Sequence, residues 1–98
     1  MYRGTTPTLN FQLPLVVSQI TKLNIAFSQN DVVVLEKSLQ DVTCSGRTIT
    51  LKLSEAETLS LNDKKELKLQ LRIGIGNNRL ASGIITTNVK SILKEGVL

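Results

Sequence analysis

The sequence predicts an all-β fold in which two small antiparallel sheets pack as a β-sandwich. Apolar and polar residues alternate over most of the chain, and this two-residue period is that of a strand with one buried and one exposed face. Turn-forming residues separate the alternating segments at short, regular intervals. No segment is long and periodic enough to be a crossover helix between parallel strands, so the strands are expected to pair mainly antiparallel.

The N-terminal half contains three expected strands. The first covers residues 8–13, where every second residue is apolar, and it stops at Pro14, which lacks the N–H that a strand ladder needs. The second covers residues 22–27, and the polar residues 28–31 after it predict a hairpin turn. The third covers residues 32–39. It begins with consecutive valines, and apolar residues on both faces predict a strand that is covered on both sides.

The middle of the chain contains the one helical signal. Residues 41–46 are expected to break the preceding strand, and alternation over residues 48–53 predicts the next one. Ser54 and Glu57 have the spacing of a capping box, in which each side chain bonds a backbone N–H of the other residue. At most one short helical turn is therefore expected, near residues 55–60.

The longest alternation, over residues 67–75, predicts a central strand. The Gly-Asn-Asn sequence at residues 76–78 tolerates positive φ angles and predicts a tight hairpin into residues 79–81. The final strand is expected over residues 84–89, and its extension to Leu93 stays open.

These segments amount to six or seven strands, and 98 residues are enough for one domain, 1–98. Two face-to-face sheets that bury the alternating Leu, Ile, Val and Phe side chains form a small sandwich of immunoglobulin-like type, although the Cys–Trp–Cys pattern of antibody domains is absent. A small closed barrel explains the same alternation and is the alternative. Residues 1–8 are expected to form an extended N-terminal arm.

The composition excludes most catalytic chemistry. The chain has no histidine and one cysteine, and therefore no imidazole base, no His or Cys metal cluster and no internal disulfide. No nucleophile motif or calcium loop is present, and the glycines at positions 74 and 76 lack the third glycine and the helix of a nucleotide-binding loop. We expect no catalytic residue, no cofactor and no metal ligand, and we interpret the protein as not an enzyme.

The charge and the apolar runs favour a soluble protein. Twelve Lys and Arg residues against eight Asp and Glu residues give a net charge of +4, which we attribute to solubility. The polar residues 1–8 are not expected to be a signal peptide, and the longest apolar runs are far shorter than a membrane span. The unpaired Cys44 fits a reducing compartment, and we interpret it as an ordinary half-buried thiol.

Five residues are candidates for interaction: Tyr2, Arg3, Lys52, Lys68 and Arg72. The first two are of types enriched at protein interfaces, and the arm that carries them either docks on a partner or lies along its own sheet. The three basic residues lie on the polar faces of expected strands and form a basic stripe for phosphates or an acidic protein if those strands are neighbours. The open edges of the sheets are a second docking route. Proteins that bind single-stranded nucleic acid need aromatic side chains on which bases stack, and this chain has only three aromatic residues. Nucleic acid is therefore not the favoured partner.

Several segments together point to one family. They are Tyr2-Arg3-Gly4-Thr5-Thr6-Pro7-Thr8, Phe11-x-Leu13-Pro14, Ile25-x-Phe27-x-Gln29, Val34-Leu35-Glu36-Lys37, Ser54-x-x-Glu57 and Gln70-Leu71-Arg72. In these segments, which span nearly the whole chain, the sequence resembles short proteins encoded in bacterial prophages. It is also similar, more distantly, to the N-terminal immunoglobulin-like domain of phage baseplate upper proteins. The resemblance implies a virion context and an accessory role in a tail or baseplate.

Two functional hypotheses follow. The first is a non-enzymatic interaction module, a prophage tail or baseplate accessory protein, which offers its sheet edges and its arm to phage structural proteins or to further copies of itself in a homo-oligomer. The alternative is a small basic protein that binds nucleic acid or another polyanion. Neither hypothesis involves a cofactor or a membrane. The resemblance implies that the protein is made in the cytoplasm of a bacterial host, with the virion as a second location.

Overall fold

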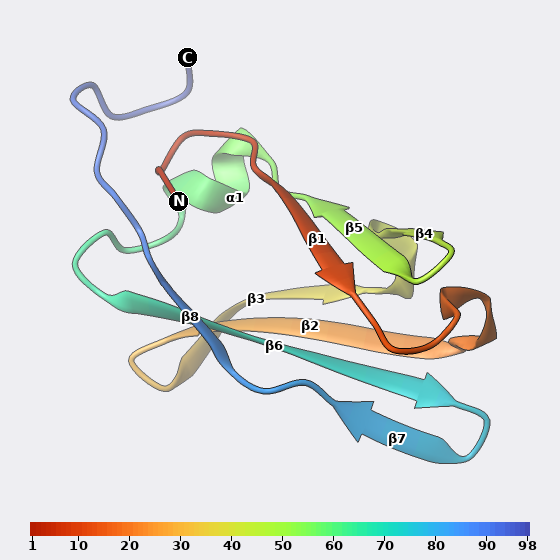
Figure 1. Cartoon of the computed structure of the whole chain (residues 1–98). Coiled ribbons are helices and arrows are strands. Elements are labelled where there is room, and N and C mark those ends of the chain that lie inside the picture. Colours follow the sequence, from red (N-terminus) through yellow and green to blue (C-terminus); the bar gives the residue numbers. More distant parts are fainter.

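The computed structural model describes residues 1–98 and confirms the prediction of a small all-β sandwich (Figure 1). Two antiparallel sheets pack face to face, and the molecule measures 45 × 26 × 18 Å along its principal axes. No ladder joins the two sheets, so the closed barrel that was the alternative is wrong.

The larger sheet has five strands. In spatial order, β3, β2 and β6 are followed by β7 and β8, which pair with different halves of the same edge of β6. Their bounds are β2 (Lys22–Gln29), β3 (Val32–Ser38), β6 (Glu66–Ile75), β7 (Asn78–Ala81) and β8 (Ile85–Asn88). The expectation that the longest alternation forms a central strand is therefore confirmed, because β6 pairs with β2 on one side and with β7 and β8 on the other.

The smaller sheet has three strands, in the order β1 (Thr8–Gln12), β5 (Thr48–Lys52) and β4 (Thr43–Ser45). Short helical segments connect the sheets: η1 (Val17–Gln19), η2 (Leu39–Asp41) and α1 (Glu55–Leu59). The five-residue helix α1 lies within the range predicted for the single helical turn, and both halves of its Ser54 and Glu57 capping box are present.

Two hairpins have the turn chemistry that the sequence predicts. Asn30 and Asp31 join β2 to β3 with φ angles of 54° and 62°, the left-handed values of a tight two-residue turn that Asn and Asp tolerate. Gly76 has a φ of 55° in the turn between β6 and β7, a conformation that glycine adopts without steric cost.

The core lies between the sheets and contains fourteen buried apolar residues. The inward faces of β2, β5 and β6 supply most of it, as their alternation predicts. The narrower sheet does not cover the wider one, and residues outside the ladders complete the interior, among them Val17 in η1, Ile20 before β2, Leu61 after α1 and Val89 after β8.

The N-terminal arm ties the two sheets together. Its beginning runs parallel to the segment after β8: the Met1 carbonyl accepts a hydrogen bond from the Lys90 N–H at 2.7 Å, and Tyr2 forms a parallel bridge with Lys90. Its end continues into the smaller sheet, where the Leu53 N–H donates to the Pro7 carbonyl at 3.0 Å. Both chain termini therefore lie near α1, at the end of the molecule opposite the β6–β7 hairpin (Figure 1).

Two expectations about the third and fourth strands are wrong. The structure has eight strands rather than six or seven. Residues 41–46 were expected to end the third strand without forming one of their own, but β4 (Thr43–Ser45) lies within them and pairs with β5. Strand β3 is not covered on both sides: it is an edge strand, and Val32, Val33 and Val34 are 61%, 53% and 41% exposed. Valine is common in edge and central strands alike, so the run of valines did not reveal its position.

The last strand and the cysteine also differ from expectation. Strand β8 ends at Asn88, so neither the predicted end at Val89 nor the extension to Leu93 is formed. Lys90 pairs with the arm in an isolated bridge instead. Cys44 is exposed rather than half-buried, because it lies on β4, at the edge of the smaller sheet.

The attachment of the arm depends on Thr58, a fully buried residue of α1. Its Oγ1 accepts a hydrogen bond from the Thr5 N–H at 3.0 Å and donates to the Thr5 carbonyl at 2.8 Å. We predict that Thr58→Val lowers the free energy of unfolding by about 1–3 kcal/mol, because the shape is kept while the partners lose their bonds. Urea unfolding measures the loss. Thr86→Val, at an exposed site, is the control, and equal midpoints for the two variants would contradict the assignment.

Candidate interaction site

The first two candidate residues lie in the docked arm. The guanidinium of Arg3 donates to the Leu59 carbonyl at 2.7 Å and forms an ion pair with Glu95 at 2.6 Å, so its charge is used within the molecule. Tyr2 is half-exposed, and the Lys90 ammonium lies 5.3 Å from its ring centroid, in reach of a cation–π interaction. Of the two interpretations of the arm, the structure shows the one in which it lies along its own domain.

The three basic candidates do not form the expected stripe. Lys68 and Arg72 lie two residues either side of Gln70 on the outer face of β6, whereas Lys52 is on β5, in the other sheet. The stripe was conditional on neighbouring strands, and the sequence carries no signal of which strands share a sheet.

The structure instead brings Arg72 together with two basic residues that the sequence analysis did not single out. On the outer face of the larger sheet, Lys22 is paired with Gly74 across one ladder and Arg79 with Gly74 across the next. Arg72 precedes Gly74 by two residues and therefore points to the same face. These three side chains, which we call the basic cluster, are all exposed and line one shallow basin with Asn24 and Gly74.

The sheet edges are the second candidate. Strand β3 pairs with β2 on one side only, and its exposed valines lie at the start of this open edge. The opposite edge of the larger sheet is discontinuous, since Ser82, Gly83 and Ile84 separate β7 from β8. The smaller sheet ends in β1 and in the three-residue β4. Strand β3 therefore offers the longest continuous free edge of the larger sheet.

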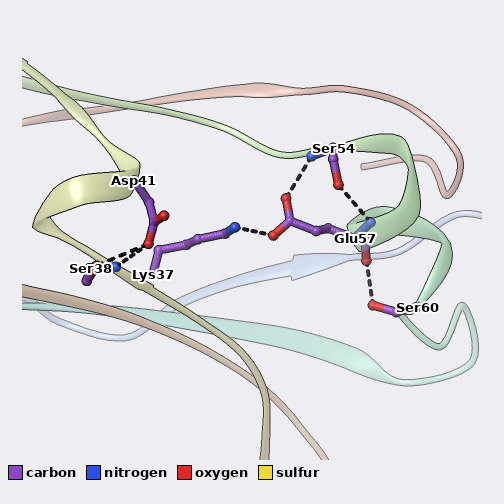
Figure 2. Close-up of polar contacts among 6 residues, drawn as sticks. All are labelled: Lys37, Ser38, Asp41, Ser54, Glu57 and Ser60. Atoms are coloured by element: carbon purple, nitrogen blue, oxygen red, sulfur yellow. Dashed lines mark hydrogen bonds and ion pairs between the residues drawn. The ribbon is translucent and has the colours of Figure 1, made fainter.

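A polar network connects this edge strand to α1 (Figure 2). Lys37 lies on the core side of β3, opposite Ile25, and forms an ion pair with Glu57. The two side chains are 16% and 22% exposed, so the pair is partly shielded from water. Glu57 also accepts a hydrogen bond from the Ser54 N–H at 2.8 Å, and Asp41 accepts one from the Ser38 N–H at the same distance.

Two carboxyl groups of this network have lowered pKa values. For Glu57 the largest influence, burial, raises the pKa, but the bonds from Lys37 and the Ser54 N–H together outweigh it and the net direction is downward. For Asp41 the Ser38 N–H has the largest effect and lowers the pKa, against a smaller opposing effect of burial. These bonds account for the lowered pKa values, and through them both carboxylates stabilise the folded structure.

Three further features bear on known kinds of site: metal-ligating groups, membrane-spanning helices and similarity to known proteins. No three residues of the metal-ligating types Cys, Asp and Glu are grouped closely enough to hold a metal ion. No helix has the length and apolar character needed to cross a bilayer. Comparisons with protein-family models, with curated proteins and with solved structures find no match.

The Glu57 ion pair predicts an acid-dependent loss of stability. A carboxyl whose pKa is lower in the folded than in the unfolded protein stabilises the fold above its unfolded pKa, and this contribution is lost as the pH falls through the folded pKa. Below about pH 4, where free carboxyl groups protonate, we expect Glu57→Gln to lose less Tm than the natural protein, although it starts less stable at pH 7. Thermal unfolding from pH 7 to pH 2.5 measures this. Parallel curves for Glu57→Gln and for the exposed, unpaired Glu66→Gln would contradict the role of the ion pair.

Proposed function

We propose that the protein is a non-enzymatic interaction module, an accessory component of a prophage tail or baseplate, and that it binds its partner along the free edge of β3. The sequence resemblance supports the phage context. The observation that carries the proposal is the exposed run Val32–Val34 on β3, an edge strand whose outer side pairs with no other strand.

An open edge of this kind suits strand addition. The outward N–H and C=O groups of an edge strand lack partners in the sheet, and an extended segment of another chain can bond them. Exposed valines add apolar contact on either side of such a segment, and contiguous exposed apolar residues are typical of interaction sites. The partner is therefore an extended segment of a phage structural protein or of a second copy of this chain.

A local irregularity gives the edge selectivity. The register between β2 and β3 shifts at Phe27 and Ser28, which leaves Val34 as an extra residue on β3. Such a bulge bends and twists the strand and disfavours indiscriminate edge pairing, so a matching partner strand must follow the bend.

In this proposal the N-terminal arm stabilises the domain, whereas the first hypothesis from the sequence had it also bind the partner. Its backbone is bonded to the segment after β8 and to Leu53, and Arg3 is paired with Glu95. Binding therefore relies on the sheet edge rather than on a free arm.

The alternative, nucleic-acid binding, has less support. Of the two phenylalanines, Phe27 is fully buried and Phe11 is packed against the core, and neither forms a platform on which bases could stack. The separation of Lys52 from the other candidate cations also removes the continuous basic stripe.

The substitution Val33→Lys tests the edge. This side chain faces outward opposite Ser28, so we expect the free energy of unfolding to change by less than about 0.5 kcal/mol, while an added charge opposes strand addition. The measurement is light scattering after size exclusion, with the chain alone and mixed with purified phage tail and baseplate proteins.

A complex with such a tail protein, or an oligomer, that Val33→Lys abolishes is the expected result. Val16→Lys is the matched control: it is an exposed valine outside the strands and should keep the complex. A strictly monomeric chain with no tail partner, or a complex that both variants keep, contradicts the proposal.

A further inference from the structure

We propose that the basic cluster of Lys22, Arg72 and Arg79 is a binding site for a phosphate group. The site lies at the start of β2 and the end of β6, whereas the exposed valines lie at the start of β3 beside the end of β2. It is therefore at the other end of the larger sheet from the proposed docking edge and does not depend on that proposal.

The cluster is assembled by the pairing of three adjacent strands. Lys22 of β2, Gly74 of β6 and Arg79 of β7 stand side by side across the sheet, and Arg72 is the next outward residue on β6. Neighbouring strands lie roughly 5 Å apart, so the backbones at Lys22 and Arg79, one strand from Gly74 on either side, are roughly 10 Å apart. The three cations line one basin of about 190 Å³, which is large enough for a tetrahedral anion.

Gly74 gives the basin its floor. A Cβ at this position would lie 3.0 Å from Nη1 of Arg79 and 3.2 Å from Cβ of Lys22, closer than side chains normally pack. The missing side chain thus lets the guanidinium of Arg79 lie against the backbone of β6. The residue is in a strand, where glycine is otherwise unfavourable, and such a glycine marks a close approach.

The guanidinium of Arg79 is already oriented. Its Nη1 donates to the carbonyls of Gly76 and Asn78, at 3.0 and 2.9 Å. Its other nitrogens make no hydrogen bond within the molecule and remain available as donors. Because the side chain is held before a ligand arrives, less conformational entropy is lost on binding, and an Arg fork matches the oxygen atoms of a phosphate.

No carboxylate neutralises the cluster. The two ion pairs of the molecule, Arg3 with Glu95 and Lys37 with Glu57, lie elsewhere. No acidic residue lines the basin, and Glu36, on the same face of the sheet, accepts a hydrogen bond from Asn24 at 3.2 Å. Three neighbouring positive charges repel one another, and a bound dianion relieves that repulsion.

The experiment titrates the protein with inorganic phosphate at constant ionic strength and follows backbone amide signals by NMR. We expect saturable shifts at Gly74 and its paired neighbours, and a loss of affinity of about tenfold in Arg72→Gln and in Arg79→Gln, since each removes a charge-assisted hydrogen bond. Both side chains are exposed, so these variants keep the core. Lys52→Gln carries the same change in net charge on the other sheet and should bind phosphate as the natural chain does.

Gly74→Ala is a sharper variant because it leaves the net charge unchanged. Its added methyl group displaces the Arg79 guanidinium and shifts Cβ of Lys22 by a few tenths of an ångström, so we expect weaker phosphate binding with amide shifts confined to the strands around Gly74. Shifts that do not saturate, that chloride reproduces, or that Lys52→Gln weakens as much as Arg72→Gln would overturn the proposal.

A short single-stranded DNA distinguishes the sources of the phosphate group. If the site serves a single phosphate or phosphate monoester, the oligonucleotide binds no more tightly than phosphate itself. If it serves a polymer backbone, the oligonucleotide binds more tightly, with an affinity that falls steeply with salt, and its binding is weakened by Arg72→Gln. An oligonucleotide that binds with the same affinity to Arg72→Gln as to the natural chain counts against the site.

Discussion

The structure depends on a mismatch of size between its two sheets. Three short strands cannot cover five, one of which is ten residues long, so strand packing alone leaves part of the interior open to water. Apolar residues outside the ladders cover it: Val17, Ile20, Leu61 and Val89 are all buried. The arm and α1 hold these covering segments in place through bonds that connect distant parts of the chain, such as the one between the Thr5 N–H and Thr58. Hydrophobic burial therefore requires the non-strand segments to be ordered.

Residue alternation predicted the strands with one buried face well, because in β2 and β6 the period of burial and the period of the sequence coincide. Alternation could not predict whether a strand is central or at the edge of its sheet. Val33 was therefore expected to be covered, but β3 is an edge strand and Val33 is exposed. Alternation also could not predict register. Lys22 and Arg79 are far apart in the sequence, and they meet only because each is paired with Gly74. The strand predicted over residues 67–75 includes this glycine, and the structure places it in β6, but nothing in the sequence says which residues pair with it.

The contacts of the polar residues also fall into two groups: local ones, which the sequence reveals, and long-range ones, which it does not. Capping-box spacing is local, so Ser54 and Glu57 could be recognised from the sequence, but the ion pair of Glu57 with Lys37 joins β3 to α1 and carries no local signal. The sequence predicts that Gln29 lies in the turn after the second strand. It is instead buried, and its side chain bonds both the N–H and the carbonyl of Asn62. Such bonds hold loops in place, and neither Gln29 nor Asn62 belongs to the two surfaces for which we propose partners, the outer edge of β3 and the basic cluster.

The pairing of the arm with the segment after β8 also determines how the molecule can be attached to something else. The amino group of Met1 bonds the Asn88 carbonyl, and the N–H of Leu98 bonds Glu55, so both termini emerge beside α1. A tether or a fluorescent fusion at either terminus leaves from this one pole (Figure 1). An immobilised molecule consequently points its β6–β7 hairpin away from the support, with the Gly74 basin facing the solution.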